Sequence, residues 1–479
     1  MSDTNMETLL NIGITLTKEK NIDNLFEIVL DAAMKITGCK LGIIYLQKDN
    51  DLVFKTLSAN SGDPILPVLH QKISAIAARN KECINISDCY SNNEFDLSDI
   101  IKYDELIGCK TVSILAVPME DDYGDVVGVL QLINAMDKNG KVVPFSKEYE
   151  RVVLSLASQT AICCTNRHNV MEVIEHLDSL VKVMSTAIDA RSPYNVNHTH
   201  NMAIYAKKFI SWLNNKGIEI FDDERERQFL MSIWLHDIGK LVVPSDVMHK
   251  DSRLGKKFES VMNRMQEFRM QAEIDFLKHE IEDDEYKRRL QEIEHVCELI
   301  EVSNRSEFLT NEVLDELSEL SKKSIHGPNG VVAYLTPDEL TCISVRKGNL
   351  TDDERRVMES HVQMTRRMLS QVKFPRSYRF VPLWASAHHE FLNGNGYPDK
   401  LSAQSIPLEV RILTILDIYD ALTADDRPYK SATPTEETFT ILTEMADNGQ
   451  IDRQVLEMFR ESEAWRVSEE ETDISSASK

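Results

Sequence analysis

The chain lacks the long apolar segments of membrane proteins, because no apolar run approaches the ~20 residues that cross a bilayer. It also lacks an N-terminal basic segment followed by an apolar core, which is the mark of a signal peptide. Its eight cysteines include no C-x-x-C pair, which is typical of buried thiols in a reducing compartment. We therefore expect a cytoplasmic protein without a membrane span.

Positive charge is also scarce, with 54 lysines and arginines against 78 aspartates and glutamates, and a net charge of −24 at pH 7. Nucleic acids and anionic membranes are bound by basic surfaces. The charge therefore argues against a nucleic-acid partner, but it leaves room for a small anionic ligand in a local positive pocket. The chain shows no internal repeat and no nucleotide-binding P-loop.

The hydrophobic periodicity predicts an α+β domain over residues 1–165. Two helices are expected before residue 37, with a break at Lys20-Asn21. Strands are then expected at Leu41–Leu46 and Leu52–Phe54. The segments Val112–Pro118 and Val126–Ile133 flank a polar turn and predict a hairpin in an antiparallel sheet.

The hairpin from Val112 to Asn134, together with a helix expected after Pro144-Phe145-Ser146, resembles a GAF domain. GAF domains are sensory modules, and some bind cyclic nucleotides through an Asn-Lys…Phe…Asp-Glu signature. Here Asn134 is followed by Ala135, and Tyr149-Glu150 stands where Asp-Glu would be. The resemblance implies either an unidentified small ligand or a ligand-free dimerisation and packing module, and both readings stay open.

Residues 148–190 contain neither proline nor glycine, and their apolar side chains recur at alternating spacings of three and four. These residues are Val170, Val173, Leu177, Leu180, Met184 and Ala187. Such a heptad seam predicts a connecting helix over residues 166–190. A parallel coiled coil in a homodimer fits this seam, and so does a single amphipathic helix packed on its own domain.

Residues 191–465 form the remaining domain, which a charged stretch at about 251–345 interrupts. We expect an antiparallel helical hairpin there, then a shorter helix capped by the Thr310 side chain, and a loop at His326–Gly330. The acidic tail, residues 466–479, is too polar to fold alone and is expected to be disordered.

Three apolar runs of this last domain lead into metal-competent side chains. Ile233–Leu235 leads into His236-Asp237, Trp384–Ala387 into His388-His389, and Ile412–Leu416 into Asp417. A buried polar group without a partner costs several kcal/mol, and a metal ion supplies such a partner. Imidazole nitrogens together with carboxylate oxygens suit first-row transition metals. A hydrogen-bonded core pair explains one such run, but three are hard to explain by core packing.

These motifs, with Gly394-Asn395-Gly396-Tyr397-Pro398 and Asp417–Thr423, resemble the HD-GYP family over about residues 189–459. Its members are all-helical, metal-dependent phosphodiesterases that hydrolyse the bacterial second messenger cyclic di-GMP. The resemblance implies a multidomain fold: a GAF-like α+β domain, a connecting helix, and an all-α HD-type phosphohydrolase domain with a helical insertion.

Matching the family motifs position by position implies seven metal ligands: His198, His236, Asp237, His361, His388, His389 and Asp417. Asp237 is expected to bridge two metals. Some members bind a third metal through a glutamate where this chain has Tyr194 and Asn195, so we expect a binuclear centre. The resemblance implies iron or manganese, and the ligands also accept zinc.

Two metals ~3.5–4 Å apart lower the pKa of a bound water, which then attacks phosphorus. Asp237 and Lys240 are the expected catalytic residues. Lys240 lies one helical turn from His236 and can place an ammonium against a phosphate oxygen. Its alternative reading is a solvated lysine at a helix end.

The predicted substrate-binding residues are Arg427, Lys430 and Tyr397. Arg427 and Lys430 are the local positive charges expected to bind the guanylate phosphates, whereas Tyr397 packs structurally or faces the substrate or a partner protein. The loop Gly394-Asn395-Gly396 is expected to need positive φ at both glycines, and Pro398 to stiffen its exit.

The leading hypothesis is a GAF-regulated phosphodiesterase that opens cyclic di-GMP to linear pGpG, with further hydrolysis to GMP left open. One alternative is the same chemistry on another cyclic dinucleotide such as cyclic GMP-AMP. A second is a catalytically inactive cyclic di-GMP receptor or adaptor.

Overall fold

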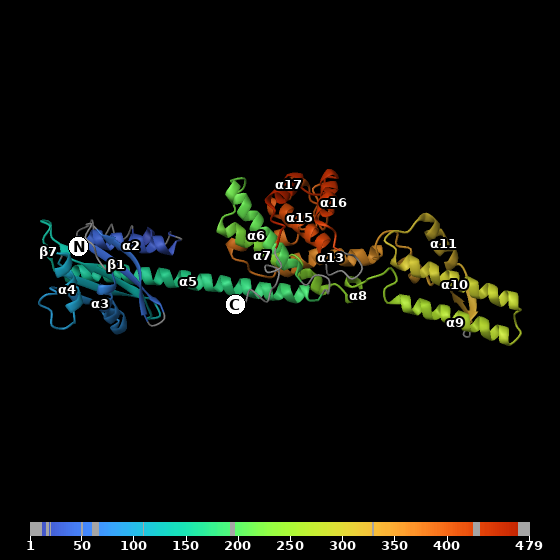
Figure 1. The fold of residues 1–479 in the computed structure, drawn as a ribbon, viewed down its shortest axis with the longest axis horizontal. Helices are drawn as coiled ribbons and strands as arrows, with labels where there is room; N and C mark the ends of the chain where they lie inside the picture. Colours follow the sequence, from blue (N-terminus) through green and yellow to red (C-terminus); the bar gives the residue numbers. More distant parts are fainter. Residues whose placement is uncertain are drawn as a thin grey trace. The chain divides into compact units, whose positions relative to one another are not determined.

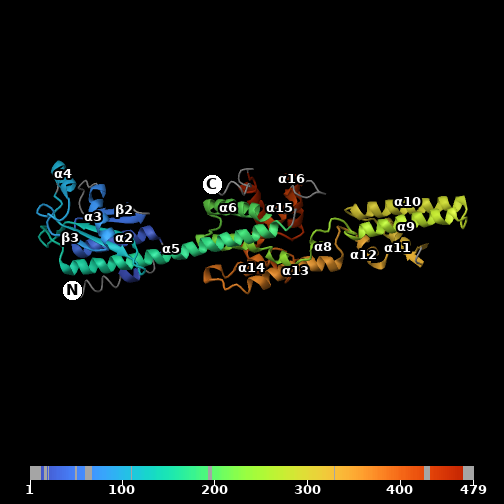
Figure 2. The same cartoon turned by 90° about the horizontal axis from the view of Figure 1, so that it is seen from below.

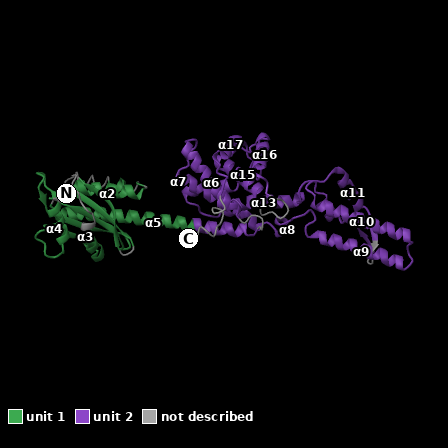
Figure 3. Cartoon of the chain, viewed as in Figure 1, with its two compact units in different colours: residues 1–177 green, residues 178–479 purple. Residues whose placement is uncertain are grey.

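The chain divides into two compact units, residues 1–177 and 178–479, and each has its own hydrophobic core (Figure 3). The computed structural model describes residues 12–15, 19, 21–48, 51–59, 67–108, 110–191, 197–327, 330–424 and 432–467. Over these residues, no helix combines the length and the apolar composition that crossing a bilayer requires.

The first unit is built around a five-stranded antiparallel sheet with the strand order β2-β1-β5-β4-β3 (Figure 1). The strands are β1 (Leu41–Lys48), β2 (Asp51–Ala59), β3 (Ile84–Ile86), β4 (Ile114–Glu120) and β5 (Val126–Ile133). A short ladder pairs β6 (Ala135–Met136) with β7 (Val142–Val143). The predicted strands and hairpin are confirmed, with β4 starting two residues later than expected.

Helices cover both faces of this sheet (Figures 1 and 2). They are α2 (Ile22–Thr37), α3 (Pro67–Asn80), α4 (Ser98–Ile107) and the first part of α5 (Lys147–Asp189). Along β1, Ile43 and Tyr45 pack with α3 and α4, whereas Ile44 packs with α2 and α5. Burial on both faces explains why β1, β4 and β5 are apolar at nearly every position.

Asn134, the first residue of the partial GAF signature, holds the sheet together at the end of β5. Its Oδ1 accepts hydrogen bonds from the backbone N–H groups of Val112 at 2.7 Å and Ser113 at 3.2 Å. Its Nδ2 donates to the carbonyl of Lys110 at 2.7 Å. Asn134 thus has a role in the fold itself, because it ties the segment before β4 to the end of β5.

Helix α5 begins in the core of the first unit and ends in the second. Its early residues Val153, Leu156 and Ala157 are buried against the sheet. The heptad seam is largely exposed, at Val170, Val173, Leu180 and Met184. Other residues of its last turns, Val181, Ser185 and Ile188, are buried in the second unit. The exposed seam therefore does not support the alternative in which these side chains pack the helix against a domain of the same chain.

The second unit is mainly helical, and its largest core joins α6, α7 and α15–α17 (Figure 1). Its helices outside the insertion are α6 (His198–Lys216), α7 (Asp223–Leu235), η1 (Ile238–Val242), α8 (Ser245–Met248), α13 (Asp352–Leu369), η2 (Arg376–Tyr378), α14 (Val381–Ala385), η3 (Ala403–Ser405), α15 (Leu408–Thr423), α16 (Thr435–Asp447) and α17 (Arg453–Ser462). Capping explains where α13 starts, because Thr351 and Glu354 form a reciprocal capping box.

The insertion has a core of its own and contains the predicted helical hairpin, whose two helices lie side by side in Figures 1 and 2. Its elements are α9 (Lys257–Leu277), α10 (Asp283–Arg305), α11 (Asn311–Ser321), β8 (Ser324–Gly327), β9 (Gly330–Ala333) and α12 (Pro337–Ile343).

Two expectations for the insertion need correction. The loop expected at residues 326–330 is shorter, because His326 and Gly327 lie in β8 and Gly330 lies in β9, and residues 328–329 lie outside the described part. Thr310 stands at the start of α11, but its side chain caps no backbone amide; it lowers the pKa of Glu312 instead.

Candidate metal centre

The seven predicted metal ligands come from five places in the second unit. His198 is the first residue of α6, His236 directly follows α7, and Asp237 precedes η1. His361 lies in α13, His388 and His389 follow α14, and Asp417 lies within α15. The fold brings all seven side chains together, as the following distances show.

The same local hydrogen bond orients three of the histidines. The Nδ1–H of His236 donates to the carbonyl of Ile233 at 2.7 Å, that of His361 to Met358 at 2.6 Å, and that of His388 to Ala385 at 2.8 Å. Each acceptor lies three residues before its histidine, so the backbone turn itself sets the tautomer. A donating Nδ1 leaves the lone pair on Nε2, the atom that can bind a metal.

Five buried atoms of this group have no hydrogen-bond partner: Nε2 of His198, His236, His361 and His388, and Oδ1 of Asp237. A buried polar atom without a partner costs about 1–3 kcal/mol. Five such atoms facing one another are expensive in a metal-free core, whereas metal ions would satisfy all of them at once. These atoms make the group a candidate metal centre.

The ligands form two groups, which we call the first triad (His198, His236 and Asp237) and the second triad (His361, His388 and His389). Within each triad the ligand atoms lie within 4.8 Å of one another. Asp237 reaches both, because its Oδ2 lies 3.2 Å from Nε2 of His236 and its Oδ1 lies 3.4 Å from Nε2 of His361. The geometry suits a carboxylate shared by two ions.

Asp417 spans the two triads in the same way. Its Oδ1 lies 3.2 Å from Nε2 of His198 and 4.0 Å from Nε2 of His236, and its Oδ2 lies 3.9 Å from Nδ1 of His389. Ligands ~2.1 Å from one ion are ~3.0 Å apart at right angles and ~4.2 Å apart when opposite. These separations all fall between those limits, so the residues fit two metal ions.

The histidines of the second triad are held neutral. Burial lowers the pKa of His388 well below its usual value and the pKa of His389 to about 4, and it lowers the pKa of His361 as well. A neutral imidazole can donate its lone pair to a metal without first losing a proton. The second triad is therefore ready for a metal at neutral pH.

His198 in the first triad differs because two carboxylates flank its ring. Its Nδ1 lies 2.7 Å from Oδ2 of Asp420, and Asp417 lies on the Nε2 side. Burial alone would lower the pKa of His198, but the neighbouring carboxylates of Asp417 and Asp420 raise it to about 10. Without a metal, a proton on His198 compensates the two negative charges.

Lys240 lies in η1, and its Nζ is 2.5 Å from Oδ2 of Asp237. Burial disfavours its charge, but Asp237 and Asp417 raise the pKa of Lys240 above its ordinary value. Burial would also raise the pKa of Asp237, yet His236 and Lys240 hold it well below its ordinary value. Lys240 is thus a fixed ammonium beside the ligands rather than a solvated helix-end lysine.

Two residues that sequence reasoning missed join η1 to α13. The Thr365 hydroxyl donates to the His236 carbonyl at 2.9 Å and accepts the Gly239 N–H at 3.0 Å. Gly239 packs against the backbone of α13, where an added Cβ would lie 1.9 Å from the carbonyl oxygen of His361. The glycine in the motif after His236-Asp237 was a signal, but its packing partner is 122 residues away.

The loop after the second triad is anchored by Glu390, which is 2% exposed. Its two carboxylate oxygens accept the N–H groups of Asp399 at 2.6 Å and Leu401 at 2.8 Å. Gly394 has the expected positive φ of 74°. The expectation for Gly396 is wrong: it lacks a positive φ and is required because a Cβ would lie 2.3 Å from the Phe391 nitrogen.

Tyr397 lies beside the second triad, with its ring centroid 4.8 Å from that of His389. Its backbone N–H donates to the His389 carbonyl at 3.1 Å, and Pro398 follows it. Asn395 is exposed at the tip of the loop, where its N–H donates to Oδ1 of Asn393. Tyr194, Asn195, Arg427 and Lys430 lie outside the described residues.

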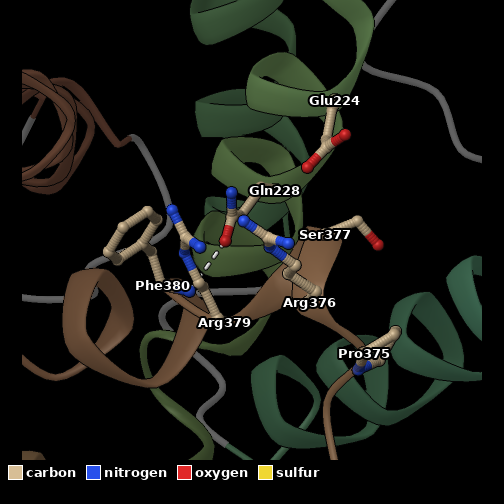
Figure 4. A pocket seen from close by; sticks show the side chains of 7 residues that line it. All are labelled: Glu224, Gln228, Pro375, Arg376, Ser377, Arg379 and Phe380. Carbon is tan, nitrogen blue, oxygen red and sulfur yellow. Dashed lines mark hydrogen bonds between the residues drawn. The ribbon is translucent and has the colours of Figure 1, made fainter.

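A cavity of about 620 Å³ between α7 and η2 contains none of the predicted site residues (Figure 4). Arg376, Arg379 and Gln228 line it, and Oε1 of Gln228 accepts the Phe380 N–H at 2.7 Å. Among the described residues, the candidate metal ligands therefore lie elsewhere in the second unit and not around this cavity.

Comparison with known families supports both parts of the chain. A family model described as GAF domain matches residues 21–164, and one described as HD domain matches residues 329–455. The HD match contains His361, the second triad's other histidines and Asp417. His198 and His236-Asp237 precede it, on the other side of the insertion.

Curated relatives match short segments of the chain. The cyclic di-GMP phosphodiesterase response regulator RpfG of Xanthomonas campestris pv. campestris is 41% identical over 90 residues, 19% of this chain and 23% of that protein. The 3'3'-cGAMP-specific phosphodiesterase 3 of Vibrio cholerae serotype O1 is 35% identical over 99 residues, 21% of each chain. The chain thus spans about a quarter of the length of these relatives or less.

Among solved structures, the GAF domain/HD domain protein from Geobacter sulfurreducens aligns with 16% identity and a TM-score of 0.26, over 32% of this chain and 97% of that one. On the two family matches, the chain contains a GAF domain within residues 21–164 and an HD domain that includes residues 329–455.

Proposed function

We propose that the chain is a metal-dependent phosphodiesterase that hydrolyses cyclic di-GMP to linear pGpG. The observation that supports this proposal is the set of five buried candidate ligand atoms without a hydrogen-bond partner. The carboxylates of Asp237 and Asp417 each lie close to histidines of both triads. Curated relatives named as cyclic di-GMP phosphodiesterases support the choice of substrate. Hydrolysis of pGpG onward to GMP stays open.

Iron or manganese is the metal we propose, and the donor set also accepts zinc. Two such ions would supply a hydroxide near neutral pH and neutralise charge on the phosphate. The first triad would hold one ion, the second triad the other, and Asp237 and Asp417 would touch both. Lys240 keeps its proton at neutral pH, so its ammonium stabilises a phosphate oxygen as negative charge develops there.

Tyr397, Arg427 and Lys430 are proposed to hold the substrate. The position of Tyr397 beside His389 supports a contact with the nucleotide, since an aromatic ring can stack on a base. The two cations are proposed from the motif alone, because guanidinium and ammonium groups pair with phosphate.

A purified full-length protein loaded with manganese or iron tests the proposal. We expect it to convert cyclic di-GMP to pGpG, and the His236→Ala variant to lose more than 100-fold in rate. A wild-type protein that binds both ions but converts no cyclic dinucleotide would favour the inactive receptor or adaptor.

The second candidate substrate is 3'3'-cGAMP, because relatives of comparable sequence identity are named as specific for it. The same preparation should therefore be assayed with both dinucleotides at equal concentration. A larger kcat/KM for cyclic di-GMP supports the leading proposal, and the reverse order replaces it with the second candidate.

We also propose that the GAF domain binds an unidentified small ligand and regulates hydrolysis through α5, and that two copies pair along its seam. The exposed apolar side chains of Val170, Val173, Leu180 and Met184 support this pairing. Sedimentation of the wild type and of Leu180→Lys tests it, since a charge in the seam should shift a dimer toward monomer.

A further inference from the structure

The last residue of α5, Asp189, lies beside the start of α6, which begins with His198. Its carboxylate accepts two hydrogen bonds from Thr199: Oδ2 from the backbone N–H at 3.3 Å and Oδ1 from the hydroxyl at 3.1 Å. Asp189 is 6% exposed and Thr199 is 1% exposed. The pair is therefore a buried, charge-assisted contact between two helices.

This contact replaces the usual cap of α6. Asn197 stands at the N-cap position, but its side chain makes no capping hydrogen bond. Capping bonds of this kind fix the first turn of a helix and contribute about 0.5–2 kcal/mol. Here the first turn carries a metal ligand, so the carboxylate of Asp189 fixes the backbone from which His198 reaches the centre.

The position of His198 thus depends on two carboxylates with different origins. Asp420 holds the ring from α15, inside the HD-domain match. Asp189 holds the backbone from α5, the helix whose early turns lie in the sheet core of the first unit. A change in the position of the end of α5 therefore acts directly on the backbone next to His198.

The second triad has no comparable link to α5 among the described residues. The Nδ1–H groups of His361 and His388 donate within their own segments, to Met358 and Ala385. The two triads therefore differ in their connection to the helix that joins the domains.

We propose that Asp189 is a positioning residue that couples α5 to the first triad, so that a displacement of the end of α5 changes metal affinity there first. The proposal rests on the proposed metal centre. It assigns the coupling to one carboxylate and one threonine, and it predicts that the two subsites respond unequally.

Calorimetric titration of the metal-free, full-length protein with Mn²⁺ tests this coupling. His198→Ala and His361→Ala serve as references in which one triad is damaged. We expect Asp189→Asn to weaken the first triad by about 10–100-fold, the usual effect of losing a partner behind a metal ligand. The second triad should keep its affinity within about twofold.

Two controls separate positioning from general damage. Glu172→Gln removes an exposed carboxylate from the same helix and should change neither subsite. Thr199→Ser keeps the hydroxyl that Asp189 accepts and should resemble the wild type, whereas Thr199→Val should weaken the first triad. If Asp189→Asn does not fold, as judged by circular dichroism, the Mn²⁺ affinities of Thr199→Ser and Thr199→Val test the coupling in its place.

The possible results distinguish failure of the proposed Asp189 coupling from failure of the proposed metal centre. Two-site binding by the wild type with no change in Asp189→Asn overturns the coupling and leaves the centre standing. Equal weakening of both triads in a folded Asp189→Asn overturns it too, because that is the result of a general structural role. A wild type without two Mn²⁺ sites overturns the proposed centre, and the coupling with it.

Discussion

Replacing Gly239 with alanine should break the metal centre through a steric clash between backbone segments. A Cβ at this position would lie 1.9 Å from the carbonyl oxygen of His361 and 2.6 Å from the nitrogen of Thr365. Both atoms belong to the backbone of α13, so no side-chain rotation relieves the contact. The segment that carries Asp237 and Lys240 must therefore move away from α13.

The required movement is large compared with the tolerance of a metal site. Ordinary contact begins at 3.4 Å, so the two backbones must separate by about 1.5 Å. The distance from Oδ1 of Asp237 to Nε2 of His361 would then grow from 3.4 Å to about 4.9 Å. Two ligands of one ion cannot lie more than ~4.2 Å apart at bond lengths of ~2.1 Å. Asp237 can then no longer share an ion with the second triad.

Manganese content and hydrolysis of cyclic di-GMP measure this outcome. We expect Gly239→Ala to retain at most one ion and to lose at least about 100-fold in rate, as a displacement of 1 Å can cost that much. Gly13→Ala is the matched control, because a Cβ there would meet its nearest neighbour at an ordinary 3.6 Å. Full metal content and wild-type rate in Gly239→Ala would refute the steric reasoning.

Three further outcomes follow from the same centre. Thr365→Val should lower the free energy of unfolding by roughly 1–3 kcal/mol in urea, because the His236 carbonyl and the Gly239 N–H lose their shared hydroxyl, and Thr365→Ser should restore it. Glu390→Gln should speed hydrogen exchange at the amide of Asp399 or Leu401, since a carboxamide cannot accept both bonds; unchanged exchange would contradict this anchoring. At pH 7, metal binding to the first triad should release at least one proton, because the pKa of His198 is about 10 and that of His236 is also raised, and calorimetry in buffers of different ionisation enthalpy measures it. This release should fade as the pH rises through about 10, and binding at the neutral second triad should release almost none.

Much of the architecture could be predicted because local patterns determine it. Short apolar segments that flank polar turns in the first 165 residues predicted an antiparallel sheet, which is confirmed. The lack of proline and glycine after Lys147 predicted one long helix, and α5 runs to Asp189. The spacing of apolar residues in the insertion predicted its helical hairpin, and α9 and α10 form it.

The supporting residues of the centre could not be predicted, because their partners are distant in the sequence. Thr365 acts on His236 across 129 residues, and Asp420 acts on His198 across 222. Gly396 illustrates a different error, since a glycine pattern shows that a Cβ is not tolerated but not whether φ or packing is the reason. Motifs thus indicated the candidate ligands, whereas the contacts that orient their side chains could be found only in the structure.

The closed base of the insertion has a consequence for how the chain folds. Nε of Arg253, near the start of the insertion, donates to the carbonyl of Val345 at its end, at 2.7 Å, and the segment between them packs its own core. Because the two ends of the insertion meet and its residues pack together, its formation shortens the effective chain length between Asp237 and His361. We therefore expect the nearly one hundred inserted residues to delay assembly of the HD domain only until the insertion has folded, after which the two flanking segments close as if they were neighbours in the sequence.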